Sequence, residues 1–363
     1  MTDFDSSCTS DYNWYWVNRI GMSPDGTTLL AATRGYYGNW GNIYRSTDGG
    51  VSWTPTQCAS FWDVKFDPNN SSNALATGRD YNFSTEQWES HIYRTTNGGS
   101  TWTETQTWSD SSGRIELGWA PGTLGTAYAV RDANSGTLYK TTDGGSSWST
   151  VSTPGHLGAQ GWYDNTIWVS PTDSNLVVVG GIDTYRSTNG GSTWTQISQW
   201  WNWPTSAHAD HHVIVHHPTY NGSTNKTVFF GNDGGIWKAA DVTTVAPTSG
   251  WTNLNSTLGI TQFYGGSGAA SAGSSPMILI GGTQDNGHLH YNGSLDWTQT
   301  NGGDGGFTAS DPGDGNYMYG EYVNLTLYRS TNGGSTYNNI CSGITEANTT
   351  YCKGSGEALF IAP

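Results

Sequence analysis

Acidic residues in short loop-like segments are the part of this sequence best suited to chemistry. Several lie beside glycines, as at residues 231–235 and 302–306, where a ligand can approach the backbone closely. Two carboxylates that face each other across a groove can cleave a glycosidic bond, one as acid and the other as base or nucleophile. The candidate catalytic residues are Asp210, Asp233, Asp285 and Asp304.

Histidines accompany one of these acids. His208 and His211 flank Asp210, and imidazole and carboxylate groups are ligands for divalent metals such as Ca²⁺ or Zn²⁺. One hypothesis is a metal site made of His208, Asp210 and His211. The alternative is that these histidines only hydrogen-bond carbonyl groups and line a channel, so that no cofactor is needed.

Aromatic and charged residues near these segments could hold a substrate. Tryptophan faces stack on sugar rings, although ordinary packing is an equally good explanation for any single tryptophan. The predicted substrate-binding residues are Trp162, Tyr163, Asp164, Asp183, Trp201, Trp203, Arg34, Arg79 and Arg131.

A repeated phrase shows which elements position these residues. The order aromatic, basic, Ser/Thr, Thr, Asp/Asn, Gly, Gly and, three residues later, a second aromatic occurs at residues 44–53, 93–102, 139–148, 185–194 and 328–337. The first four copies recur every 46–49 residues, and the last gap equals three such repeats. A period near 47 with about four short strands per unit predicts an all-β propeller. We expect seven four-stranded blades, or eight if the chain is part of a longer protein.

The phrase resembles the Asp-box (BNR) repeat of sialidases, two-propeller xyloglucanases and sortilin-type receptors. The resemblance extends over residues 17–340 and implies that each box is a structural turn between the third and outermost strands of a blade. Residues 232–237 are similar to the segment that holds a catalytic aspartate in xyloglucanases. Sialidases need three arginines, a Tyr–Glu pair and an early Arg-Ile-Pro segment, and this sequence does not show that pattern.

Propeller topology sorts the candidate residues by position. The start of the first strand and the loop between the second and third strands lie at the same end of every blade. The acids of blades four to seven therefore surround one opening, and blades one to three contribute Arg34, Arg79 and Arg131.

The composition limits the partners and the compartment. A formal net charge of −15 disfavours nucleic acid and anionic membranes, and no apolar run long enough to insert into a membrane occurs. Four cysteines in a Lys-poor, Trp-rich chain favour secretion, with Cys341–Cys352 and then Cys8–Cys58 as the expected disulfides. The alternative is that all four cysteines are free buried thiols. This chain shows no signal peptide.

Three functions follow as hypotheses. The first is a secreted glycoside hydrolase that acts on a poly- or oligosaccharide. The second is a non-catalytic glycan- or protein-binding propeller, and the third is an extracellular structural or assembly protein. Residues 1–16 are expected to help close the ring, and residues 341–363 to form a disulfide loop followed by a closing or truncated strand. An unpaired strand there would permit self-association.

Overall fold

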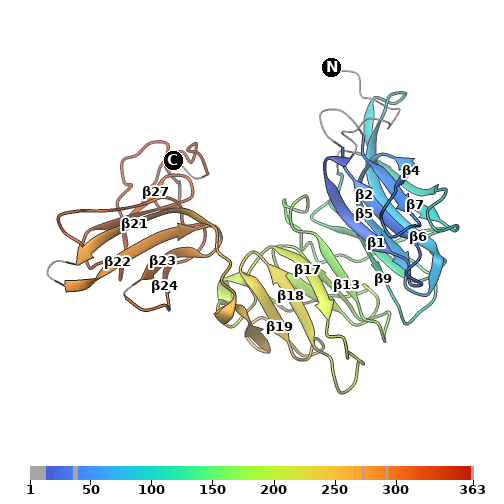
Figure 1. Ribbon diagram of the computed structural model, residues 1–363. Helices are drawn as coiled ribbons and strands as arrows, with labels where there is room; N and C mark the ends of the chain where they lie inside the picture. The colour runs from blue at the N-terminus through green and yellow to red at the C-terminus, as the bar shows by residue number, and fades with distance from the viewer. Residues whose placement is uncertain (1–13, 36–39, 111, 272–273, 292, 361–363) are drawn as a thin grey trace. The chain divides into compact units, whose positions relative to one another are not determined.

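The protein is an all-β chain of seven antiparallel sheets (Figure 1). The computed structural model describes residues 14–35, 40–110, 112–271, 274–291 and 293–360. Each sheet has four strands that pair in chain order, as the repeat predicts. The described residues contain no α-helix, only the short 3-10 turns η2 (Trp200–Asn202) and η3 (Asn255–Thr257), and no helix long and apolar enough to cross a membrane.

Five sheets belong to the first of two compact units, Met1–Ser256. Their strands are β1 (Val17–Met22), β2 (Leu29–Thr33), β3 (Asn42–Ser46) and β4 (Thr54–Cys58); β5 (Ser60–Asp67), β6 (Asn70–Asn82), β7 (Gln87–Thr95) and β8 (Thr103–Ser109); β9 (Ile115–Trp119), β10 (Ala127–Arg131), β11 (Thr137–Thr141) and β12 (Ser149–Val151); β13 (Thr166–Val169), β14 (Val177–Gly180), β15 (Thr184–Ser187) and β16 (Thr195–Gln196); and β17 (His211–His216), β18 (Val228–Asn232), β19 (Gly235–Ala239) and β20 (Trp251–Asn253).

Two sheets belong to the second unit, Thr257–Pro363. Their strands are β21 (Phe263–Ser271), β22 (Ser274–Thr283), β23 (Gly287–Tyr291) and β24 (Thr298–Asn301); and β25 (Thr308–Ser310), β26 (Met318–Tyr322), β27 (Thr326–Ser330) and β28 (Asn338–Asn339). The expectation of one propeller over residues 17–340 stays a prediction.

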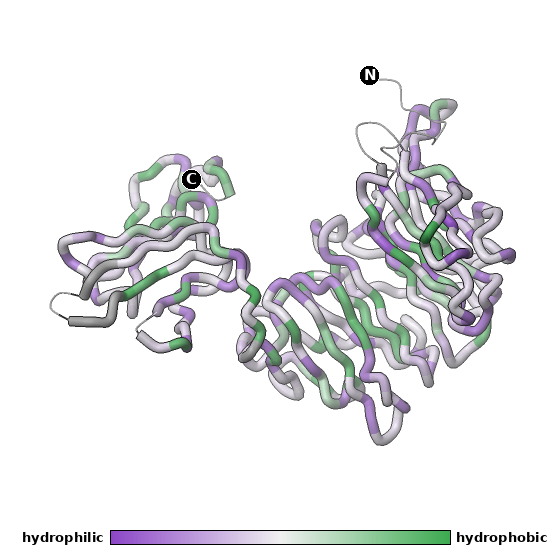
Figure 2. The backbone as a smooth tube through the Cα atoms, in the orientation of Figure 1, coloured by the Kyte–Doolittle hydropathy of each residue, from purple (hydrophilic) through white to green (hydrophobic). Residues whose placement is uncertain are grey.

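Apolar inner strands build the core of the first unit. All four residues of β14 are buried, and hydrophobic residues concentrate along the strands (Figure 2). Side chains from neighbouring sheets pack together, as Trp168 and Val178 of the fourth sheet do with Ile214, Phe230 and Trp237 of the fifth. Packing of this kind fixes the strand ends, from which the loops project.

The repeated phrase forms the turn between the third and fourth strands in five sheets. In the first turn, the Ser46 hydroxyl donates to Asp48 over 2.7 Å, and the Ser52 amide donates to the same carboxylate oxygen over 3.0 Å. Gly49 and Gly50 have φ of 75° and 88°, a region that favours glycine. The turns at Asn97, Asp143, Asn189 and Asn332 repeat these bonds. The repeat therefore supplies structural turns.

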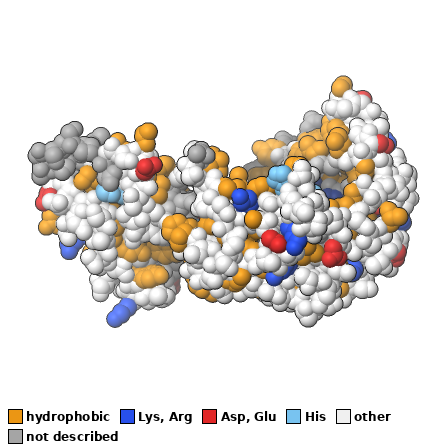
Figure 3. Space-filling view, turned by 90° about the horizontal axis from the view of Figure 1, so that it is seen from below, with side chains coloured by type: hydrophobic (Ala, Val, Ile, Leu, Met, Phe, Trp, Pro, Cys, Tyr) orange, Lys and Arg blue, Asp and Glu red, His pale blue; other side chains and the backbone are white. Residues whose placement is uncertain are grey.

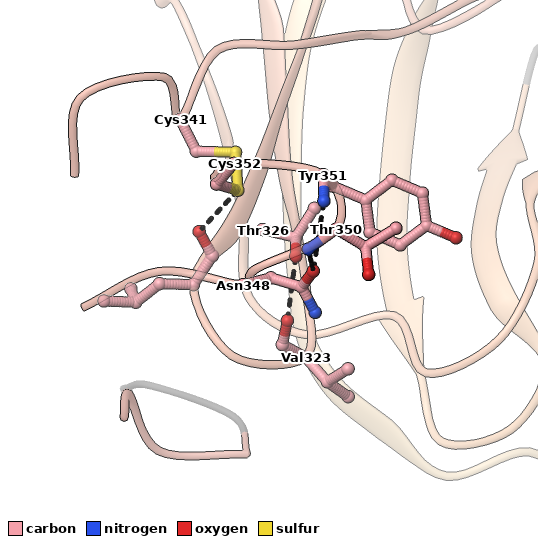
Figure 4. The surroundings of a disulfide bond; sticks show 8 residues. Val323, Thr326, Cys341, Asn348, Thr350, Tyr351 and Cys352 are labelled. Atoms are coloured by element: carbon pink, nitrogen blue, oxygen red, sulfur yellow. Dashed lines mark hydrogen bonds between the residues drawn. A yellow bond between two sulfur atoms is a disulfide. The ribbon is translucent and has the colours of Figure 1, made fainter. Parts of the chain in front are cut away.

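A disulfide closes the loop after the last strand of the second unit (Figure 4). Cys341 and Cys352 are bonded, as predicted, and the Cys352 sulfur lies 3.8 Å from the Leu325 carbonyl oxygen. Residues 354–360 contain no strand, although the Asn324 amide donates to the Phe360 carbonyl over 2.9 Å. The rest of the predicted strand, residues 361–363, lies outside the described residues.

The N-terminal segment is described only from residue 14. Trp14 stacks on Tyr44 with ring centroids 3.9 Å apart, and the Arg34 amide donates to the Trp16 carbonyl over 3.0 Å. Cys58 is disulfide-bonded, whereas Cys8, its predicted partner, lies outside the described residues. A ring-closing role for residues 1–16 stays a prediction.

Candidate functional site

Four acids of the first unit lie at the same end of two neighbouring sheets. Asp164 precedes β13 and Asp210 precedes β17, at the starts of the two first strands. Asp183 follows β14 and Asp233 follows β18, in the loops between second and third strands. Because the strands are antiparallel, these positions share one end of each sheet, as the sequence predicts.

Asp164 and Asp210 form a carboxyl pair. The Gln160 side-chain amide donates to Asp164 over 3.1 Å and to Asp210 over 2.7 Å. Asp164 is fully buried, whereas Asp210 is half-buried. Burial, together with the neighbouring Asp210 charge, raises the pKa of Asp164 to about 8. Burial and the Asp233 charge also raise the pKa of Asp210. Such a pair titrates as a unit, and the raised pKa values favour retention of one proton by the pair.

The backbone holds Asp210 in an uncommon conformation. Its φ of 62° lies in the left-handed region, which most side chains avoid. The amides of Asp210 and His211 donate to the carbonyls of Ile182 and Gly181 over 3.2 and 2.8 Å. The preceding sheet therefore fixes this conformation and aims the carboxyl group.

The surroundings of Asp233 favour its ionised form, unlike those of Asp164 and Asp210. The Tyr163 hydroxyl donates to one carboxylate oxygen over 2.7 Å, and Nε2 of His212 lies 2.6 Å from the other. Burial raises the pKa of Asp233, but the hydrogen bonds from His212 and Tyr163 outweigh it, and the net pKa is lowered. Carboxylate oxygens of Asp233 and Asp210 lie within 4.8 Å of each other. Two nearby carboxyl groups therefore favour different protonation states, which is the property of an acid–base pair.

Asp183 anchors a tryptophan-rich segment. Its carboxylate accepts bonds from the Trp200 amide over 2.9 Å, from the Ser198 hydroxyl over 3.3 Å and from the Gln196 amide group over 3.2 Å. Burial raises its pKa to about 6. The exposed fractions of Trp162, Trp200, Trp201 and Trp203 are 65%, 50%, 58% and 49%. Asp183 thus supports a loop with exposed aromatic faces, and its own carboxylate is already bonded.

The predicted metal ligands do not converge. His211 is fully buried, packs edge-on against Phe230 at 6.1 Å, and has no hydrogen-bond partner on either ring nitrogen. Burial lowers its pKa to about 3. Nδ1 of His208 lies 3.3 Å from the Ala209 carbonyl. Among the described residues, His208, Asp210 and His211 do not together form a group whose ligand atoms gather closely enough for one ion.

The three predicted arginines differ in their surroundings. Arg34 and Arg79 stack over Trp62 and Trp88, at 4.0 and 4.2 Å from the ring centroids. Arg131 is buried, ion-paired with Asp110 and stacked on Trp108. The pairing of Arg131 indicates a structural role.

Sequence reasoning missed a buried charge network beside this site. Asp63 is fully buried and pairs with Arg19 over 3.0 Å, and Arg19 reaches Glu116 over 3.1 Å. Arg114 pairs with Glu116 over 3.1 Å and donates to the Tyr163 carbonyl. The network therefore supports the residue that holds Asp233. His212 and Gln160 were also missed as site residues.

The second unit holds the other two predicted acids. The Asp285 amide donates to the Asp304 carboxylate over 3.2 Å, and Asp285 has φ of 58°. Burial, followed by the charges of Asp304 and Asp285, raises the pKa of Tyr264. The structure therefore brings Asp285 and Asp304 together.

Comparisons with known proteins agree on the fold. No protein-family model matches this sequence, and no curated protein matches it. The chain is similar to the GH74 enzyme of Niastella koreensis, with a TM-score of 0.50 and 19% identity over 92% of this chain and 60% of that chain. It is also similar to the GH74 xyloglucanase of Xanthomonas campestris, with a TM-score of 0.53 and 14% identity over 90% of this chain and 61% of that chain. The chain thus spans about three fifths of the length of these enzymes. At such identities the likeness concerns the fold alone, and the protein is an all-β chain with a β-propeller fold.

Proposed function

We propose that this protein is a glycoside hydrolase in which Asp210 donates a proton and Asp233 acts as base or nucleophile. The observation that supports the proposal is that two neighbouring carboxyl groups favour opposite protonation states. The Asp164–Asp210 pair retains a proton, whereas hydrogen bonds from Tyr163 and His212 keep Asp233 ionised. Hydrolysis of a glycosidic bond requires one carboxyl group in each state.

The surrounding residues have positioning roles in this proposal. Asp164 is fully buried, so it reaches the substrate only through Asp210, whose proton it shares. Gln160 orients both carboxyl groups. Tyr163 and His212 fix the Asp233 carboxylate and stabilise its negative charge. After Asp210 protonates the leaving oxygen, the pair can take a proton back from water.

The exposed tryptophans support a carbohydrate substrate. Trp200, Trp201 and Trp203 lie on the segment that Asp183 anchors, and Trp162 precedes Tyr163. Large exposed aromatic side chains that gather on a surface often mark a ligand-binding site. Sugar rings offer C–H faces that stack on such rings, so a poly- or oligosaccharide is the proposed partner.

We also propose that the protein is secreted. The Cys341–Cys352 disulfide is stable in an oxidising compartment, where polysaccharides are also found. Charged residues make up 12% of the chain, and on the face in Figure 3 they are scattered among uncharged side chains. With a net charge of −15, this composition suits a neutral or weakly charged partner better than a dense polyanion.

The test is digestion of a panel of polysaccharides, with products read by mass spectrometry. The wild type is compared with D210N, D233N and the control D173N, which changes an exposed acid outside the site. We expect oligosaccharide products from the wild type and D173N, and at least a hundredfold slower release from D210N and D233N. Full activity in both site variants would refute the assignment. Saturable binding without any product would instead support a glycan-binding propeller, which the exposed tryptophans also favour.

A further inference from the structure

The hairpin of β6 and β7 carries a histidine and two acids on one of its faces. Asp80 of β6 stands directly opposite Glu89 of β7 in the antiparallel ladder. His91 lies two residues after Glu89 on the same strand, so its side chain points to the same face. This hairpin belongs to the second sheet, whereas the candidate acids Asp210 and Asp233 flank strands of the fifth.

The side chains of these three residues converge. Nε2 of His91 lies 3.1 Å from Oδ1 of Asp80. One ligand atom from each of Asp80, Glu89 and His91 lies within 4.8 Å of the other two. Two ligands of a tetrahedral Zn²⁺ ion, each about 2.0–2.1 Å from the metal, are about 3.3 Å apart. The distance between His91 and Asp80 therefore suits two atoms that share one ion.

Both ring nitrogens of His91 face carboxylates. Nδ1 lies 3.2 Å from Oε2 of Glu104 and 3.2 Å from the Thr107 hydroxyl, while Nε2 faces Asp80. A neutral imidazole carries one N–H group, so in either tautomer one lone pair points at a carboxylate. That contact is favourable only when a proton or a metal ion lies between the two groups. Metal-bound histidines commonly donate their second N–H group to a carboxylate, and Glu104 is placed to accept it from Nδ1.

The acids of this face outnumber its basic groups. Among the described residues, His91 is the only basic group within 4.0 Å of Asp80, and Glu89 has none. Glu89 instead accepts hydrogen bonds from the side chains of Asn82 and Ser109, both over 3.2 Å. Like charges directly opposite each other in an antiparallel ladder are destabilising, and a divalent cation offsets their repulsion. The Asp80 side chain is 31% exposed and that of His91 is 4% exposed, so a cation reaches the buried ring from the side of the acids.

We propose that Asp80, Glu89 and His91 bind a divalent transition-metal ion, for which Zn²⁺ is the best match, and that Glu104 positions the His91 ring. Zn²⁺ binds imidazole nitrogen readily, whereas Ca²⁺ and Mg²⁺ prefer oxygen ligands alone. Three protein ligands leave a fourth position for water. The ion joins β6 to β7 and so stabilises their hairpin. The site does not depend on the proposed hydrolysis, because none of its ligands is a candidate catalytic acid.

The experiment measures metal binding to the untagged chain after a chelator has removed bound metal and has itself been dialysed away. Isothermal titration is performed with ZnCl₂, MnCl₂ and CaCl₂. D80N, E89Q and H91Q test the ligands, and E104Q tests the positioning residue. H217Q is the matched control, because His217 lies just after β17 and its ring contacts Thr219 rather than a carboxylate. Thermal unfolding in the presence of the chelator confirms that each variant is folded. Nitrogen-15 NMR of the histidine rings, with the His91 signals identified by their loss in H91Q, reports which nitrogen binds the ion.

We expect the wild type and H217Q to bind Zn²⁺ equally well, and at least tenfold more tightly than Ca²⁺. D80N, E89Q and H91Q should each weaken Zn²⁺ binding at least tenfold, and E104Q should weaken it by about tenfold and shift the Nδ1 signal of His91. Zn²⁺ should move the Nε2 signal of His91 and raise the unfolding temperature of the wild type more than that of H91Q.

Several results would overturn the proposal. The first is the absence of saturable Zn²⁺ binding together with a doubly protonated His91 ring, which would show that a proton joins the ring to Asp80. The others are Zn²⁺ affinity that is the same in D80N, H91Q and wild type, or Ca²⁺ binding as tight as that of Zn²⁺. Zn²⁺ binding at His91 by a chain that cleaves no glycan would leave this inference intact and would not rescue the hydrolase.

Discussion

Replacing Tyr163 by Phe removes a side-chain hydrogen bond that helps to keep Asp233 ionised. The bond is 2.7 Å long and ends on a carboxylate whose side chain is 9% exposed. A hydrogen bond to a charged group contributes about 1.5–3 kcal/mol, and 1.36 kcal/mol corresponds to one pKa unit. Because the hydroxyl stabilises the ionised form, Y163F should raise the pKa of Asp233 by about 1–2 units.

The assay is a carbon-13 NMR titration of Asp carboxyl groups, in which the Asp233 signal is identified by its loss in D233N. Y220F is the matched control, because Tyr220 lies in the loop between β17 and β18, at the opposite end of the sheet from Asp233, and its hydroxyl contacts Ser170 rather than a carboxylate. If the enzyme turns over substrate, the acid limb of its pH profile should move upward by the same amount. An Asp233 pKa that is the same in Y163F and wild type would refute the reasoning.

Three further predictions concern stability. N189A removes the hydrogen bonds that Asn189 makes with Thr193 and Ser187, and it should lower the free energy of unfolding by about 1–2 kcal/mol. N189D should be tolerated, because Asp143 makes the same bonds in its own turn. Urea unfolding measures both variants. C341S/C352S removes the disulfide between two cysteines that are 11 positions apart in the sequence, and it should destabilise the second unit by about 3 kcal/mol in the same assay. An unchanged unfolding midpoint would contradict this prediction. His156 is buried, and burial lowers its pKa to about 3, so that below pH 6.5 the unfolded chain binds more protons than the folded chain. The free energy of unfolding should therefore fall as the pH drops from 6.5 toward 3, and H156Q should weaken that pH dependence. An equally steep loss of stability in H156Q would exclude His156 as its cause.

The repeat made the architecture predictable from sequence. The turn at Asp48 is specified by residues within four positions of it, so its structure is encoded locally and repeats wherever the phrase occurs. Since every sheet has four strands in chain order, a constant period fixes which loops share an end. For that reason the sequence alone predicts that Asp164, Asp210 and Asp233 lie at the same end of their sheets.

The sequence alone does not predict contacts between residues that are far apart in the chain. His212 follows Asp210 by two residues, yet only the pairing of β17 with β18 brings it to Asp233. His211 pairs with Asn232 in the same ladder, but its ring is buried against Phe230, and this overturns the simple expectation that neighbouring histidines share a ligand. Gln160 has no chemical signature in sequence, and only its position between two carboxyl groups reveals its role.

The most direct test of the central claim is the pH dependence of kcat/KM for hydrolysis by the wild type and by D164N. The proposed acid is the Asp164–Asp210 pair, whose upper pKa is about 8, so the wild-type rate should fall above that pH. Since that value belongs to the coupled pair, D164N should move the alkaline limb to lower pH. A rate that stays constant to pH 10, or an alkaline limb that is identical in D164N, would contradict the account.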